Sequence, residues 1–74
     1  DFSRLFKNSI NFNSSIQNWA TVNVISTVSM FEGAEMFNQP VDNFIMTNVT
    51  NMDSMFLNAK SFNQNITTWN NHQL

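Results

Sequence analysis

The sequence predicts an α/β fold, a short solenoid of three coils in which each coil contributes a strand, a helix and a loop around a small parallel sheet. Apolar and asparagine residues recur every 25 positions without any insertion, and a fixed period of roughly 20–50 residues is typical of stacked repeats. Within one copy the apolar spacing changes from helical to extended. We therefore expect one repeat domain over residues 1–74, with copies at 1–25, 26–50 and 51–74, as a fragment of a longer array.

The repeat is clearest between the second and third copies. Seven aligned pairs are identical: Ser29/Ser54, Met30/Met55, Phe31/Phe56, Ala34/Ala59, Phe37/Phe62, Asn38/Asn63 and Gln39/Gln64. The first copy keeps the aromatic column, because Phe6 aligns with Phe31 and Phe56. We expect these rings to share one environment and to stack from coil to coil.

The helix is predicted from an apolar stripe in the third copy. Its members stand at i, i+3, i+4, i+7 and i+10: Met52, Met55, Phe56, Ala59 and Phe62. This spacing is that of an amphipathic helix. Asn51, Asp53 and Ser54 supply capping side chains at its start, and Asn63 is a suitable residue for its end because asparagine tolerates the left-handed conformation.

The strand and the loop complete the expected coil. Ile66 and Trp69 are apolar anchors in a polar loop after the helix, and Thr47–Thr50 is a short extended segment with Val49 pointing inward. Successive strands would pair in parallel, about 4.8 Å apart.

A column of asparagines runs through the copies at Asn13, Asn38 and Asn63. Stacked amides carry both donors and acceptors, so they can pair backbone groups that the turns leave open. We interpret this column as structural rather than ligand-binding. A second polar ladder is expected from Asn23 and Asn48, with Gln73 below them.

The third copy also resembles a known repeat. The string Met55-Phe56-x-x-Ala59-x-x-Phe62-Asn63-Gln64, followed by Ile66-x-x-Trp69 and preceded by Asn48-Val49-Thr50-Asn51-Met52, is similar to the 25-residue unit of BspA-type, leucine-rich-repeat-like surface proteins, as in mycoplasma lipoproteins. The resemblance implies a leucine-rich-repeat-like solenoid located outside the cell or on its surface, with roles in adhesion or host contact and with no catalytic residues.

The composition offers little chemistry for an enzyme. Cysteine is absent and glycine occurs once, which excludes a thiolate metal site and a glycine-rich phosphate loop. Three scattered cations and a net charge of −2 argue against a nucleic-acid partner. His72 is expected to be exposed near a terminus, and Glu32 and Glu35 are interpreted as a solvated helix face. We predict no catalytic residue, no cofactor and no metal site, and no membrane span, because no apolar run approaches ~20 residues.

The predicted function is a non-enzymatic surface module for protein–protein or adhesive interaction. Neighbours of an inward-pointing strand residue point outward, and the candidate sheet face is therefore Asn23, Ile25, Asn48, Thr50 and Gln73. The expected partner is a protein or a carbohydrate on a host or neighbouring cell. The alternative is a structural spacer that projects another domain.

Several apolar residues break the repeat because other copies are polar there. They are Met36, Ile45, Met46, Val22 and Ile10. They either form a patch that faces a partner or seal against the next coil. No cap is visible at either end, so we also expect end-to-end self-association through exposed apolar surface and unpaired edges.

Overall fold

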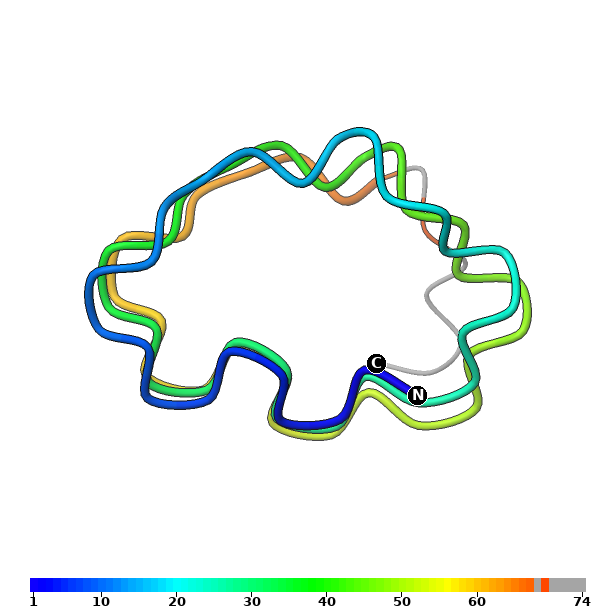
Figure 1. Ribbon diagram of the computed structural model, residues 1–74, viewed down its shortest axis with the longest axis horizontal. Coiled ribbons are helices and arrows are strands. Elements are labelled where there is room, and N and C mark those ends of the chain that lie inside the picture. The colour runs from blue at the N-terminus through cyan, green and yellow to red at the C-terminus, as the bar shows by residue number, and fades with distance from the viewer. Residues whose placement is uncertain (68, 70–74) are drawn as a thin grey trace.

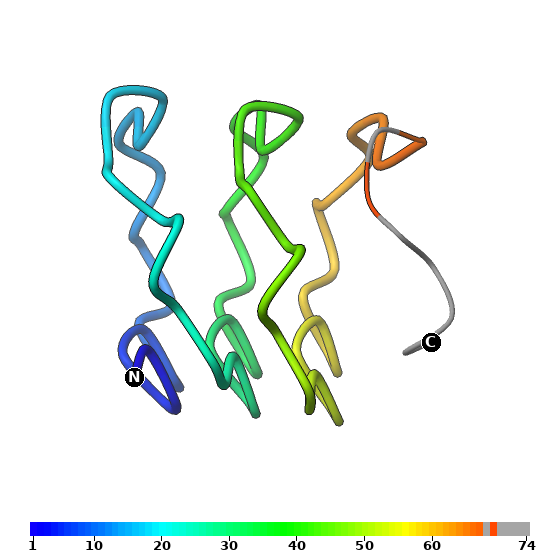
Figure 2. The same ribbon diagram turned by 90° about the vertical axis from the view of Figure 1, so that its right-hand side faces the viewer.

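The computed structural model describes residues 1–67 and 69. The chain winds around one axis, and its successive passes superpose when viewed along that axis (Figure 1). Seen from the side, the passes lie next to one another in the order of the sequence (Figure 2). We call them the first coil (residues 1–25), the second coil (26–50) and the third coil (51–67 and 69).

The expected α/β architecture is wrong. Residues 1–67 and 69 contain no helix and no strand, and the one element of β structure among them is an isolated parallel bridge between Ser26 and Asn51. The chain is therefore not a leucine-rich-repeat-like α/β solenoid with a parallel sheet. It also follows that no helix in this part of the chain is long and apolar enough to cross a membrane.

A run of tight turns replaces the expected helix. The amides of Met55, Leu57 and Ala59 donate to the carbonyls three residues earlier, at 3.0–3.2 Å. Ser54 and Asn58, the third residues of two of these turns, have φ of 57° and 61°, whereas an α-helix needs φ near −63°. A positive φ at that position, after a second residue (Asp53 or Leu57) whose φ is not positive, is characteristic of a type II turn. The equivalent positions of the other coils are also positive: Arg4, Asn8, Ser29 and Gly33.

Bonds between coils explain why the turns are preferred to a helix. Every second amide of this run points along the axis and donates to the carbonyl 24 residues later. Four such bonds of 2.8–3.0 Å join the second coil to the third: Thr27 to Asn51, Ser29 to Asp53, Phe31 to Met55 and Gly33 to Leu57. In a helix the same amides would bond within their own segment, and the coils would have no backbone link along this side.

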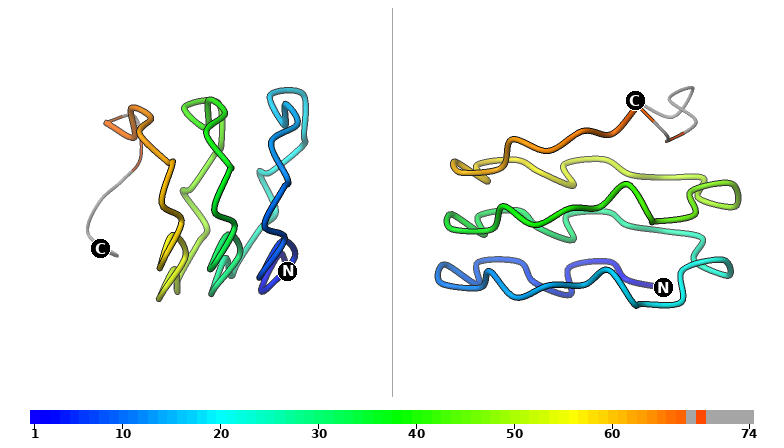
Figure 3. Two further views of the ribbon diagram at one scale, coloured as in Figure 1. Left: turned by 90° about the vertical axis from the view of Figure 1, so that its left-hand side faces the viewer. Right: turned by 90° about the horizontal axis from the view of Figure 1, so that it is seen from above.

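The predicted stacking of equivalent aromatic residues is confirmed. The ring of Phe31 is stacked between Phe6 and Phe56, with centroid distances of 5.6 Å and 5.5 Å. A second column of Phe12, Phe37 and Phe62 has spacings of 5.7 Å and 5.9 Å. These columns run perpendicular to the layers that Figure 3 shows from above.

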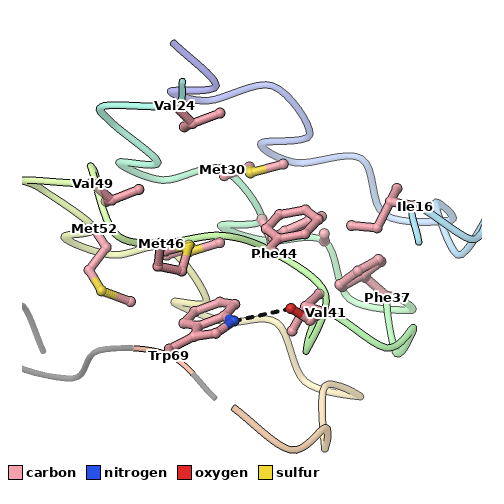
Figure 4. Close-up of a cluster of buried hydrophobic side chains, with 13 residues drawn as sticks. Ile16, Val24, Met30, Phe37, Val41, Phe44, Met46, Val49, Met52 and Trp69 are labelled. Carbon is pink, nitrogen blue, oxygen red and sulfur yellow. Dashed lines mark hydrogen bonds between the residues drawn. The ribbon is translucent and has the colours of Figure 1, made fainter. Parts of the chain in front are cut away.

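The rest of the core lies between the coils. Trp69 is stacked on Phe44 at 6.4 Å, and its indole N–H donates to the carbonyl of Val41 at 3.0 Å (Figure 4). This bond satisfies a polar atom that would otherwise be buried alone. The inner layer is completed by buried aliphatic and thioether side chains: Ile16, Val24, Met30, Met46, Val49, Met52 and Met55.

The structural role predicted for the asparagine column is confirmed. The Asn13 side-chain oxygen accepts the Asn38 amide at 2.8 Å, and the Asn38 oxygen accepts the Asn63 amide at 2.9 Å. Gln39 and Gln64 donate from Nε2 to the same asparagines, both to the backbone carbonyl and to Oδ1, at 2.9–3.1 Å. Each joint between coils is thus clamped by one asparagine and one glutamine.

Candidate binding surface

The candidate surface is the side of the stack formed by residues 20–25 and 45–50, which we call the aliphatic wall. It faces the viewer in Figure 2, where its two segments run from cyan to teal and from green to yellow-green. The wall carries four of the five residues predicted as a binding face. Asn23, Ile25, Asn48 and Thr50 are all exposed, whereas Gln73 lies outside the described residues.

The wall is held by bonds between the first and second coils, not by a sheet. Asn48 donates from Nδ2 to the Val22 carbonyl at 2.8 Å. The Thr50 amide donates to the Ile25 carbonyl at 2.9 Å, and the Ile45 amide donates to Thr21 Oγ1 at 2.8 Å. The polar ladder expected between Asn23 and Asn48 is therefore replaced by a side-chain bond from Asn48 to backbone.

Exposure on the wall follows the predicted alternation although the strand that suggested it is absent. Val24 and Val49 are buried and their chain neighbours are exposed. The turns produce this alternation, because the amides of Val24 and Val49 each close an i→i+3 bond, to Thr21 and to Met46. The residues are consequently presented at a row of bends instead of on a flat sheet face.

Three aliphatic side chains stand out on the wall: Val22, Ile25 and Ile45 are 48%, 59% and 46% exposed. Of these three residues, the repeat pattern predicts only Ile25 on the candidate face. Val22 and Ile45 are two of the apolar residues that depart from the repeat. The structure shows that these residues differ in their exposure to solvent. Val22, Ile45, Met36 and Ile10 are exposed, whereas Met46 is buried.

The electrostatics of the wall are neutral, because residues 20–25 and 45–50 include no Asp, Glu, Lys or Arg. Charges lie elsewhere on the stack. Glu35 and Lys60 form a 4.0 Å ion pair between the second and third coils, and an exposed pair of this kind adds little stability. Glu32 and Glu35 do not share a helix face, since this segment is a turn.

Other chemical features are sparse in residues 1–67 and 69. This part of the chain brings together no group of three or more His, Cys, Asp or Glu side chains that could hold a metal ion, and no pocket is detected in it. His72 lies outside the described residues.

Comparison with known proteins identifies a family whose model covers the chain. No curated protein and no solved structure matches the chain. A family described as "Mycoplasma protein of unknown function, DUF285" matches residues 1–74, which is the full length of the sequence. The chain therefore belongs to this mycoplasma family.

Proposed function

We propose that the chain is a non-enzymatic binding module that uses the aliphatic wall to hold a protein ligand. The observation that carries this proposal is the exposure of Val22, Ile25 and Ile45 on adjacent coils of one neutral surface. Apolar side chains surrounded by polar ones are the usual arrangement of a protein-binding patch. The amides of Asn23 and Asn48 form the polar surroundings here.

The location we propose is the surface of a mycoplasma cell, facing a host or neighbouring cell. Membership of the mycoplasma family supports the organism group, and the similarity of the repeat to BspA-type surface proteins supports the outer location. The same similarity supports adhesion as the purpose of binding.

The size of the effect can be estimated from exposure. Burying a whole aliphatic side chain contributes about 1.5–3 kcal/mol, and each of the three side chains has about half of its area available. Each should therefore contribute about 1 kcal/mol, which is roughly a fivefold change in the dissociation constant.

Binding of the fluorescently labelled chain to cultured epithelial cells, measured by flow cytometry, tests this proposal. Val22→Ser, Ile25→Ser and Ile45→Ser together should abolish specific binding. The matched control is Ile10→Ser with Met36→Ser, which removes equally exposed apolar side chains outside the wall and should leave binding unchanged.

Enzymatic treatment of the cells distinguishes a protein ligand from a carbohydrate ligand, and the absence of any binding would point to the spacer function. Loss of binding after trypsin treatment supports a protein ligand, whereas loss only after glycosidase treatment indicates a carbohydrate and contradicts the proposal. If the wall variant and the control variant bind equally, the aliphatic wall is not the contact surface. A chain that binds no cell or protein would favour the spacer alternative.

A further inference from the structure

The methionines of this chain divide into a core set and one surface side chain. The sequence has five of them, and all five lie in the part of the chain that the structure describes. Met30, Met46, Met52 and Met55 are exposed by 7% or less and belong to the hydrophobic core, whereas Met36 is 53% exposed and does not. Figure 4 shows Met30, Met46 and Met52 among the other buried side chains.

Met36 stands on the flank of the stack, with a coil on each side of it. Its amide donates to the carbonyl of Ile10 in the first coil at 3.1 Å. The equivalent bond of the next joint runs from the amide of Ser61 to the carbonyl of Glu35 at 3.2 Å. The exposure of Met36 is therefore that of a side chain in the middle of a continuous surface.

The fold does not require an apolar side chain at this position. The equivalent residues of the other coils are Asn11 and Ser61, which are polar and exposed. The bonds that link this position to the neighbouring coils use backbone atoms. A polar group added to the Met36 side chain would therefore remain in water and leave the packing unchanged. An oxygen added to Met30, which is fully buried, would lose its contact with water at a large cost in free energy.

We propose that Met36 is a reversible oxidation site. Small peroxides convert its thioether into the sulfoxide while the coils stay folded, and methionine sulfoxide reductases convert it back. The sulfur must meet the oxidant or the reductase, so the reaction follows exposure. The four core thioethers are protected by the same packing that holds the coils together.

The two half-reactions balance without any group from the rest of the chain. The Met36 sulfur attacks one oxygen of hydrogen peroxide, the O–O bond breaks and an S–O bond forms. The sulfur gives up two electrons, and the hydroxide that leaves takes the proton of the transferred oxygen and becomes water. In the return reaction two thiols of a reductant become a disulfide, and the sulfoxide oxygen leaves as water.

The product changes the chemistry of one place on the surface. Oxidation turns a flexible apolar side chain into a polar and chiral one. Met36 lies outside residues 20–25 and 45–50, so the aliphatic wall keeps its composition when the sulfoxide forms.

Peroxide treatment of the native 74-residue chain, followed by peptide mapping in a mass spectrometer, tests the proposal. Met36 should gain one oxygen at least about sevenfold faster than any other methionine, in line with 53% exposure against at most 7%. In concentrated urea the five methionines should react at similar rates, because unfolding exposes them all. The urea midpoint of the Met36 sulfoxide chain should equal that of the untreated chain.

Two variants assign the oxygen to its site. Met36→Leu should take up no oxygen under the conditions that oxidise the native chain. Met46→Leu, the matched control in the core, should still gain one oxygen at Met36, because leucine replaces methionine at small cost. Treatment with both methionine sulfoxide reductases, one for each epimer, and dithiothreitol should remove the oxygen from the folded chain.

Four results would overturn the proposal. They are similar rates for Met36 and a core methionine in the native chain, undiminished oxygen uptake by Met36→Leu, a lower urea midpoint after oxidation of Met36, and a sulfoxide that the two reductases cannot remove.

Discussion

Replacing Gly33 with alanine distinguishes the turn structure from a helix, because the two predict changes of opposite sign in the free energy of unfolding. Gly33 has φ of +71°, and an alanine held in that left-handed conformation costs roughly 1–2 kcal/mol. The smaller freedom of alanine in the unfolded chain offsets about 0.4–1 kcal/mol of this cost. The new methyl group would also meet the side-chain oxygen of Asn8, which is exposed and can rotate away. The net expectation is a loss of about 1 kcal/mol.

A helix predicts the opposite result, because glycine inside a helix is less stable than alanine by roughly 0.5–1 kcal/mol. Urea unfolding followed by the fluorescence of Trp19 and Trp69 measures the difference. With an m-value of about 1 kcal/mol/M, the midpoint should fall by about 1 M. Asn58→Gly, at the equivalent position of the third coil, is the control and should raise the urea midpoint. A rise in the midpoint of Gly33→Ala would refute the turn structure of this segment.

Five further substitutions test the core and the amide column by the same unfolding assay. Thr27→Val should stabilise the chain by about 1 kcal/mol, because Thr27 Oγ1 is buried with no hydrogen-bond partner and valine removes that unpaired group; a loss of stability would show that the hydroxyl is satisfied. Phe31→Ala should cost about 3–5 kcal/mol and Phe6→Ala roughly half as much, since Phe31 has rings on both sides and Phe6 lies at the end; equal losses would contradict the stacked column. Asn38→Ala should lower the free energy of unfolding by about 1 kcal/mol, because it removes the acceptor of two hydrogen bonds. Asn63→Ala in dilute solution should leave the free energy of unfolding unchanged.

The periodic part of the sequence predicted the packing well. A period of 25 without insertions requires that equivalent residues occupy equivalent places, and the columns containing Phe31 and Phe37 follow from that alone. The column of Asn13, Asn38 and Asn63 was predicted for a similar reason, because an amide at a fixed place in every copy has the same backbone groups beside it.

The secondary structure could not be predicted from the same pattern, because two geometries produce it. Apolar residues at i, i+3 and i+7 line one side of a helix, but successive turns with i→i+3 bonds also bring residues such as Met52 and Met55 inward. A signal against the helix was present in the column of Asn8, Gly33 and Asn58. Asparagine and glycine are the residues that accept positive φ most readily.

The candidate surface was predicted in part. The exposure of Asn23, Ile25, Asn48 and Thr50 followed from their places beside Val24 and Val49, and a turn and a strand give the same alternation there. Their role in binding stays a prediction. Whether Val22 and Ile45 belong to the exposed surface depends on which residues of the turns face outward. A departure from the repeat does not reveal this orientation, because Met46 also departs from the repeat but is buried.

The backbone hydrogen bonds that link residue i to residue i+24 fix the register between successive coils. Along the turns, alternate amides serve their own coil and the next one, so deleting a single residue between Gly33 and Asn51 would bring each donor opposite the wrong carbonyl. It would also move the positive-φ positions out of line and separate every later ring from its column. Removing a whole unit of 25 would leave all of these relations intact. A change of length by one complete coil is therefore the change that preserves all of these bonds and columns.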